Sequence, residues 1–312
     1  MIAFGPIPSR RLGKSLGINN IVSHKICSYS CVYCQIGNTI KKSMVRQIFY
    51  EPEILVDEVE HHLEKLTKLH KPDYLTFVAN GEPTLDINLG REIYLLKKLG
   101  FPIAVITNSS LIHHKHVRDD LMEADWVSVK VDTVNATVWK RINRPLIGID
   151  LKKILDGLKT FASDYKGKLH TETMLIDGYN DSTAQLKQNA SFIALLNPKT
   201  AYLSVPTRPP ALKTIKPVTE EKLTEAWQLF QNAGLKTELL TGFEGTDAGT
   251  TGNAFEDILN ITAVHPLRED TIARLLKQNR TDSFVVDSLV SKGLIKEVKH
   301  EGKIYYVRNY HF

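Results

Sequence analysis

Cys27-Ser-Tyr-Ser-Cys31-Val-Tyr-Cys34 contains all three cysteines of the 312-residue chain. An odd number of thiols at spacings of four and three residues cannot make a disulfide framework. The set is also one ligand short of a closed tetrahedral metal site. A metal centre held by these thiolates alone would therefore keep one coordination position open.

Two kinds of metal centre fit this stretch. An iron–sulfur cube held by three thiolates keeps one iron without a protein ligand, and that iron can bind a small molecule through an amine and a carboxylate. Alternatively, His24 precedes Cys27 by three residues and could complete a closed Cys3His zinc site. The rest of the chain has to distinguish between them.

Composition indicates an ordinary soluble chain, with 42% hydrophobic and 24% charged residues. Its length suits one large α/β domain and a small second one. Pro6 and Pro8 interrupt the apolar N-terminus, and no segment approaches the roughly 18 continuous apolar residues of a membrane span. We expect a cytoplasmic protein without a membrane partner, and a reducing compartment suits cluster-bound thiolates.

Positive charge is concentrated before residue 51. The net charge is +5, yet residues 1–50 carry seven Lys or Arg and no Asp or Glu, so the remainder sums to −2. Such a bias could attract an anionic substrate such as RNA. It could also offset cluster thiolates or simply be solvated. The residues are Arg10, Arg11, Lys14, Lys25, Lys41, Lys42 and Arg46.

Hydrophobic periodicity alternates between strand and helix as far as residue 240. The expected strands are 18–22, 74–79, 102–106, 126–131, 169–176, 201–205 and 235–240, after an extended lead-in at 5–17. The expected helices are 51–70, 88–99, 135–142, 151–163, 182–195 and 220–232. This alternation predicts a parallel α/β barrel, complete or partial, over residues 1–240.

The composition changes at residue 241. Residues 241–253 include four glycines and read as a linker or an active-site lid. Within 254–312, helical patterns at 268–276 and 282–291 precede strands at 293–298 and 303–307, which predicts a small winged helix-turn-helix domain. Its nine Lys or Arg against eight Asp or Glu leave nucleic-acid contact and protein contact both open.

Polar motifs follow the expected strands. Gly81-Glu82-Pro83 comes after the strand at 74–79, where a glycine allows close backbone approach and a carboxylate can accept from an ammonium group. Thr107-Asn108 follows the next strand and suits a ribose or a carboxylate, although it is also an ordinary turn. Alternation along residues 127–132 places Lys130 and Asp132 on one face. Inside a barrel such a lysine needs an anion; outside it would be solvated.

The cysteine spacing, Gly81-Glu82-Pro83, Thr107-Asn108 and Asp132 together resemble the core of radical S-adenosylmethionine (SAM) enzymes over about residues 15–240. The leader Gly5-Pro-Ile-Pro-Ser-Arg-Arg-Leu-Gly13 and the run Arg141-Ile-Asn-Arg-Pro145 resemble the wyosine-synthase-like group, which modifies tRNA. Wyosine synthases are expected to use additional cysteines for a second cluster, and this chain has none.

This resemblance implies a partial (β/α)6 barrel with one [4Fe-4S] cluster on Cys27, Cys31 and Cys34. It implies that reduction of the cluster cleaves SAM to a 5′-deoxyadenosyl radical, which removes hydrogen from a substrate, most favourably an RNA. The electron donor would be a flavodoxin or a ferredoxin. The implied SAM-binding residues are Tyr33, Gly81, Glu82, Pro83, Thr107, Asn108, Lys130, Asp132 and Glu172.

Two alternatives stay open at this point. A radical SAM enzyme could act on a small metabolite or on a partner protein, including methyl transfer or enzyme activation. A non-enzymatic zinc-binding winged-helix regulator would also account for the cysteines with His24. Four arginines are candidates for holding an anionic substrate: Arg10, Arg11, Arg144 and Arg208.

Overall fold

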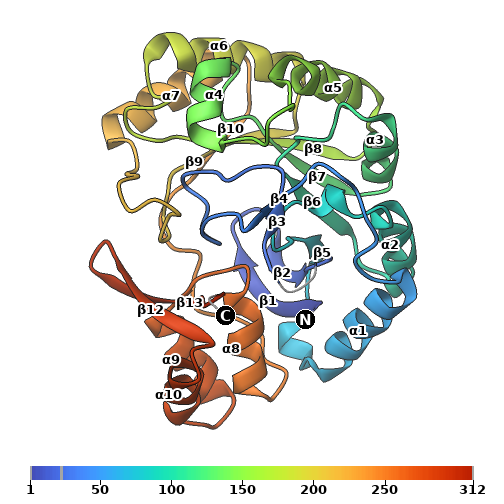
Figure 1. The fold of residues 1–312 in the computed structure, drawn as a ribbon, viewed down its shortest axis with the longest axis vertical. Coiled ribbons are helices and arrows are strands. Elements are labelled where there is room, and N and C mark those ends of the chain that lie inside the picture. The colour runs from blue at the N-terminus through green and yellow to red at the C-terminus, as the bar shows by residue number, and fades with distance from the viewer. Residues whose placement is uncertain (1, 22–23, 311–312) are drawn as a thin grey trace.

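A curved parallel sheet organises the computed structural model, which describes residues 2–21 and 24–310 (Figure 1). In these residues one eight-stranded sheet has the order β1-β2-β5-β6-β7-β8-β9-β10, with β1 antiparallel to β2 and the remaining neighbours parallel. The strands are β1 (Ala3–Ser9), β2 (Gly13–Ile18), β5 (Tyr74–Phe77), β6 (Ile103–Thr107), β7 (Trp126–Lys130), β8 (Lys168–Met174), β9 (Thr200–Ser204) and β10 (Thr237–Leu240).

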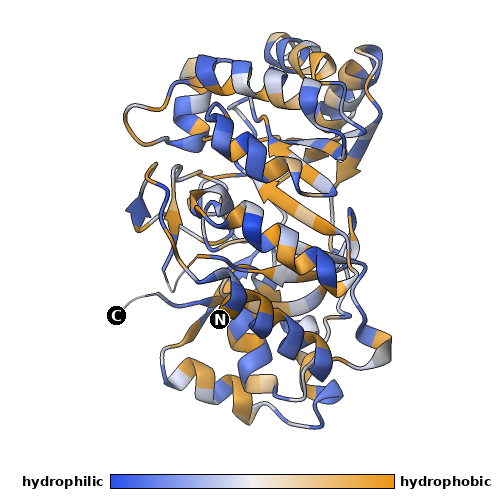
Figure 2. Ribbon diagram, turned by 90° about the vertical axis from the view of Figure 1, so that its right-hand side faces the viewer, coloured by the Kyte–Doolittle hydropathy of each residue, from blue (hydrophilic) through white to orange (hydrophobic). Residues whose placement is uncertain are grey.

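Helices cover the outer face of this sheet, and every parallel neighbour pair is connected through at least one of them (Figure 1). They are α1 (Pro52–Lys65), α2 (Leu89–Leu96), α3 (Lys115–Met122), α4 (Ala136–Asn143), α5 (Leu151–Asp164), α6 (Thr183–Leu195) and α7 (Glu220–Asn232). The architecture is the expected partial α/β barrel. Hydrophobic segments are prominent in its sheet, and hydrophilic and hydrophobic segments alternate along the helices (Figure 2).

The sequence of α5 shows why these helices form where they do. Asp150 accepts a hydrogen bond from the backbone N–H of Lys152 and caps the helix. Ile154, Leu158 and Phe161 recur at helical spacing and are buried. The helix therefore presents one apolar stripe to the sheet.

The N-terminal segment differs from the expectation. The lead-in is a β-hairpin of β1 and β2, and β2 ends at Ile18, whereas the sequence predicted a strand at 18–22. Residues 22–23 lie outside the described residues. Glycines in the lead-in obscure the alternation that would have predicted these strands. Gly17 is needed in β2 because a Cβ there would lie 2.0 Å from the Phe4 ring of β1.

The C-terminal segment forms a separate small unit that packs against β1. It contains α8 (Ala254–Thr262), β11 (Leu267–Arg268), α9 (Glu269–Gln278), α10 (Phe284–Ser291), β12 (Ile295–His300) and β13 (Lys303–Arg308). Its sheet has the order β11-β13-β12. Helix α8 and strand β11 were not expected from the sequence, and Phe4 of β1 belongs to the unit's apolar core. No helix in the described part of the chain is long and apolar enough to cross a membrane.

Candidate active site

A cavity of about 280 Å³ opens at the carboxyl ends of the parallel strands. Its size is near the lower end of ordinary small-molecule sites, which run from about 300 to 1,000 Å³. The cavity wall includes all three cysteines together with Tyr33, Gly81, Glu82, Thr107, Asn108, Lys130 and Glu172. Two expected site residues, Pro83 and Asp132, lie behind the wall: Pro83 opens a short buried helical turn, and Asp132 hydrogen-bonds Tyr33.

The cysteine loop is attached to the Gly81 turn by backbone pairing. The N–H of Ile26 donates to the carbonyl of Asn80 at 3.2 Å, and the N–H of Glu82 donates to the carbonyl of Ile26 at 3.2 Å. Gly81 has φ +144°, and a Cβ there would lie 1.7 Å from the Ile26 carbonyl oxygen. Glycine is therefore required at this crossing.

The other side of the loop is attached to two further segments. The N–H of Ser30 donates to Asn143 at 3.0 Å, and the N–H of Val32 donates to Ile142 at 2.9 Å. Leu212 donates in turn to the carbonyl of Val32 at 3.0 Å. The thiols are thus presented by a loop that is fixed on both sides.

All three thiols are free, and their chemistry depends on burial. Burial raises the pKa of Cys27 to about 11 and that of Cys31 to about 12. Because metal ligation requires thiolates, binding of a metal centre here would release protons. Lys25, which is 2% exposed, places its Nζ 3.0 Å from the Cys34 Sγ and 2.5 Å from the Gly37 carbonyl, so a buried positive charge faces the sulfurs.

These residues fit an iron–sulfur cluster by number, chemistry and placement. Three thiols and one buried cation surround a cavity wide enough for a further ligand. Among the described residues, no three His, Cys, Asp or Glu side chains are arranged as a metal site as they stand. His24 is half-buried and is not part of the cavity wall, so a fourth ligand from His24 has no geometric support.

Glu82 is held by donors from two strand ends. Its carboxylate accepts from the Thr84 and Thr107 hydroxyls at 2.7 and 2.6 Å, and from the N–H groups of Thr84 and Asn108 at 3.1 and 2.7 Å. Burial raises its pKa, and these donors work in the opposite direction. The Asn108 amide reaches the Cys27 Sγ at 3.3 Å, which links the carboxylate to the cysteine loop.

Lys130 meets a protein carboxylate inside the barrel, which is the inward one of the two orientations that the sequence left open. Its Nζ lies 2.9 Å from Glu172, which also pairs with Arg11 and accepts from the Ser204 hydroxyl at 3.0 Å. Burial opposes ionisation of Glu172, but Lys130 and Arg11 outweigh it and lower the pKa of this carboxyl.

Tyr33, within the cysteine loop, contacts this charged group. The Lys130 Nζ is 4.9 Å from the centre of its ring, and its hydroxyl donates to Asp132 at 2.5 Å. Asn143 donates to the same Asp132 oxygen at 2.7 Å. One polar network therefore joins the cysteine loop to β7 and β8.

Three residues without a predicted site role are brought to the cavity by the fold: Lys25, Ser204 and Glu244. Glu244, from the 241–253 segment, pairs with Arg208 at 2.6 Å and with Arg10 at 3.4 Å. Arg10, Arg11 and Arg208 thus line the cavity but are paired with protein carboxylates, whereas Arg144 is exposed and outside it. For Glu244, the sequence signal that could have indicated a site role was an acidic residue within the glycine-rich segment 241–253.

Three thiols on a loop at the carboxyl edge of a parallel half-barrel define the class of iron–sulfur enzymes that cleave SAM. The family model of the Radical SAM superfamily matches residues 21–190. The chain belongs to the radical SAM superfamily, and full-length similarity places it among the UPF0026 proteins within it.

The relatives agree with this placement. UPF0026 protein MJ1312 of Methanocaldococcus jannaschii is 46% identical over 99% of this chain and 96% of its own length. The dual-specificity RNA methyltransferase RlmN of Lawsonia intracellularis is 26% identical over 75% of this chain and 66% of its own length. The crystal structure of a radical SAM methyltransferase from Sphaerobacter thermophilus superposes with a TM-score of 0.51 at 17% identity, over 72% of this chain and 65% of that one.

Membership of this superfamily makes the chain an enzyme and implies a [4Fe-4S] cluster and SAM. It is inconsistent with the alternative of a non-enzymatic zinc-binding regulator. The likeness to the methyltransferase structure shows the fold, and the substrate is a separate question.

Proposed function

We propose that this radical SAM enzyme modifies RNA, with tRNA as the favoured class. The observation that carries the proposal is the convergence of the three thiols, Glu82 and Asn108 on one cavity at the carboxyl edge. RNA is supported by the charge bias of residues 1–50, which carry seven Lys or Arg and no acidic residue. Arg10, Arg11 and Arg46 pair with carboxylates from elsewhere in the chain, whereas Lys41 and Lys42 are exposed and make no ion pair in the described residues. The similarity to an RNA methyltransferase and the wyosine-synthase-like leader give further support.

Each expected site residue has a role in this proposal. Cys27, Cys31 and Cys34 hold the cluster. Gly81, Glu82 and Pro83 form the turn that receives the SAM ammonium group, since Glu82 lines the cavity and its N–H is bonded to Ile26 next to Cys27. Thr107 and Asn108 supply polar contacts, and Tyr33 packs near the adenine. Lys130 and Glu172 form a charged wall, and Asp132 acts from behind it through Tyr33.

When bound and reduced, the cluster supplies the electron that cleaves SAM and generates the hydrogen-abstracting radical. The chain itself positions the reactants and excludes water. Val78, Ile106 and Leu240 give the cavity an apolar wall, while the Arg208–Glu244 ion pair closes it from the 241–253 segment. Lys25 keeps a positive charge beside the sulfurs.

The remaining parts of the chain fit the same proposal. Residues 1–240 form the catalytic barrel, 241–253 a lid or linker, and 254–312 a unit whose helix and strand order matches a winged helix-turn-helix. A flavodoxin or a ferredoxin would supply the electron.

The test is an anaerobic incubation of the reconstituted, reduced enzyme with SAM and with separated RNA, small-molecule and protein fractions of a cell extract. We expect 5′-deoxyadenosine to rise above its background with the RNA fraction, and Cys31→Ser to abolish the rise. The wild-type protein should be brown and contain roughly four irons per chain. A rise with another fraction alone would refute the RNA assignment.

A partner protein is the second candidate, and α10 favours it. Phe284 is 77% exposed and Val290 is 42% exposed, and this helix contains no Lys or Arg. A helix with these properties suits an apolar protein surface better than a phosphate backbone. This alternative predicts that the protein fraction raises 5′-deoxyadenosine without RNA.

A further inference from the structure

Three segments without any acidic residue meet on the outer side of the cysteine loop. Residues 25–50, 133–149 and 205–219 contain no Asp or Glu. The loop donates backbone hydrogen bonds to Asn143 and Ile142, and Leu212 donates to the loop at Val32. The barrel therefore brings together three stretches of one charge sign that are far apart in the sequence.

Exposed cations on these segments form a surface that we name the basic rim. Its members are Lys41, Lys42, Lys140, Arg141, Arg144, Lys213 and Lys216. Within the described residues none of them makes an ion pair, although Arg10, Arg11 and Arg208 inside the cavity and Arg46 behind the rim all do. The rim thus concentrates positive charge that the protein does not neutralise.

The rim is attached to a rigid base. A buried apolar cluster of Val32, Val138, Ile142, Ile176 and Ile215 lies beneath it. The Lys42 Nζ donates to the carbonyl of Arg144 at 2.8 Å, and the Arg141 guanidinium lies 4.6 Å from the centre of the Tyr179 ring. These contacts attach Lys42 and Arg141 to the segments that are bonded to the cysteine loop.

We propose that the basic rim is the docking surface for the phosphate backbone of the RNA substrate. The inference rests on the proposed function and adds the place where RNA binds. A polyanion gains free energy by releasing counterions when fixed cations replace them, and unpaired cations beside a catalytic cavity provide this without competing carboxylates. Tyr179 with Arg141 adds an aromatic face on which a base can stack.

The surface of the C-terminal unit differs from the basic rim in its charge. Its α10 carries Asp287 and no basic residue. Lys296, in β12, lies next to Glu297. This unit therefore offers no comparable stretch of uncompensated charge, and the rim is the better RNA surface.

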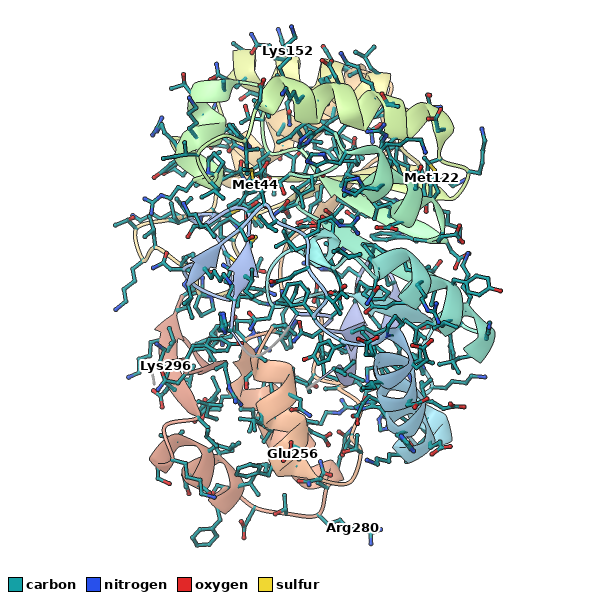
Figure 3. All side chains as sticks on the ribbon, turned by 45° about the vertical axis from the view of Figure 1, so that its right-hand side comes forward. Met44, Met122, Lys152, Glu256, Arg280 and Lys296 are labelled. Atoms are coloured by element: carbon teal, nitrogen blue, oxygen red, sulfur yellow. The ribbon has the colours of Figure 1, made fainter. Side chains whose placement is uncertain are left out.

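The test compares two variants with equal changes in net charge. The rim variant carries Lys140→Gln, Arg141→Gln, Lys213→Gln and Lys216→Gln. The control variant carries Lys152→Gln, Lys166→Gln, Lys187→Gln and Lys199→Gln, all exposed and without an ion pair in the described residues. Lys152 projects outward from α5, at the end of the molecule opposite the C-terminal unit in which Glu256, Arg280 and Lys296 lie (Figure 3).

Binding of a fluorescent tRNA transcript to each cluster-loaded protein is measured between 50 and 300 mM salt. We expect the slope of log K against log salt to be shallower by about 3 in the rim variant, at roughly 0.7–0.9 per phosphate contact, with at least tenfold weaker binding at low salt. The control variant should keep most of the wild-type slope. Poly-glutamate serves as a competitor, and stronger competition by it than by RNA would indicate an acidic protein partner instead.

Failure of the docking surface and failure of RNA modification would give different results. Equal losses in both variants, or none in the rim variant, would overturn the docking surface even if RNA raises 5′-deoxyadenosine in the wild type. Rim-dependent binding without any RNA-dependent 5′-deoxyadenosine would instead overturn RNA modification and retain a polyanion-binding surface.

Discussion

Gly81 is the residue at which the cysteine loop and the carboxylate turn cross most closely. A Cβ would lie 1.7 Å from the Ile26 carbonyl oxygen, and the residue has φ +144°. We expect Gly81→Ala to lower the free energy of unfolding by about 3 kcal/mol or more, because backbone atoms cannot move aside cheaply. Chemical denaturation and the iron content after reconstitution measure the effect.

Gly100 provides the matched control, because it has φ +80° and a Cβ added there would meet no atom within 4 Å. Gly100→Ala should cost about 1 kcal/mol from its backbone conformation alone and leave iron binding intact. Equal losses in the two variants would show that the close approach to Ile26 has no importance.

Lys25 should influence the cluster through its charge. We expect Lys25→Met to lower the cluster's reduction potential by roughly 140 mV, the effect of one unit charge about 5 Å away at an effective dielectric constant of about 20. A neighbouring cation stabilises the reduced, more negative cluster, and removing it makes reduction harder. Redox titration followed by electron paramagnetic resonance measures the potential, and Lys25→Arg should preserve it. An unchanged potential in Lys25→Met would contradict this role.

At the scale of elements, a buried carboxylate pair joins the Gly81 turn to α2. Asp86 and Glu92 are both 0% exposed, and each affects the pKa of the other. Burial and the neighbouring Asp86 raise the pKa of Glu92 to about 9. Asn20 adds a weak contact to Glu92 at 3.4 Å.

This pair predicts a pH dependence of stability. Because the folded pKa of Glu92 exceeds its ordinary value of 4.5, its contribution is present below about pH 4.5 and declines as pH rises towards 9. We expect Glu92→Gln to raise the free energy of unfolding at pH 8 by about 1–3 kcal/mol and to flatten the profile between about pH 5 and 8. Denaturant titrations at several pH values provide the measurement.

Exposed Glu64 on α1 offers a comparison for the same chemical change. Glu64→Gln should leave both the stability and its pH profile unchanged to within about 0.5 kcal/mol. A Glu92→Gln protein that is less stable than wild type at pH 8 would show that the carboxyl is ionised in the folded state.

At the scale of the whole molecule, the C-terminal unit is hydrogen-bonded to the wall of the cavity. Asn80 donates to the Tyr310 hydroxyl at 3.0 Å, and this hydroxyl donates to the Ala263 carbonyl at 2.7 Å. Gln35 of the cysteine loop donates to the carbonyl of Val264 at 2.9 Å. The unit therefore supports the site from outside the barrel.

Removing the Tyr310 hydroxyl should weaken the attachment of the C-terminal unit to the barrel. Tyr310→Phe leaves the Asn80 amide and the Ala263 carbonyl without this partner, which we expect to cost about 1–3 kcal/mol. Hydrogen exchange should become faster in peptides covering residues 77–82 and 260–266. Tyr94→Phe, at a tyrosine that is 57% exposed, should change neither measurement. Unchanged exchange in Tyr310→Phe would contradict the coupling.

Local signals predicted most of the barrel correctly. Helical periodicity located α5 and α7 to within one residue, since each carries a capping side chain and one apolar face. The sequence predicted an extended lead-in at 5–17 and a strand at 18–22, where the structure has the β1–β2 hairpin ending at Ile18, because glycine and proline obscure a strand pattern. In the C-terminal unit α8 went unrecognised, although Asn253 caps it, because it directly follows the glycine-rich segment.

The sequence by itself determined the chemistry, because the thiol count, their spacing and the order of strands and helices are properties of a linear chain. It also placed Gly81, Thr107 and Lys130 at strand ends, where a parallel sheet gathers its polar groups. Only the tertiary structure decided which charges are neutralised. Glu172 pairs with Lys130 and Arg11, Glu244 pairs with Arg208, and the basic rim makes no ion pair within residues 2–21 and 24–310. Ion pairing depends on distances across the fold and not along the chain.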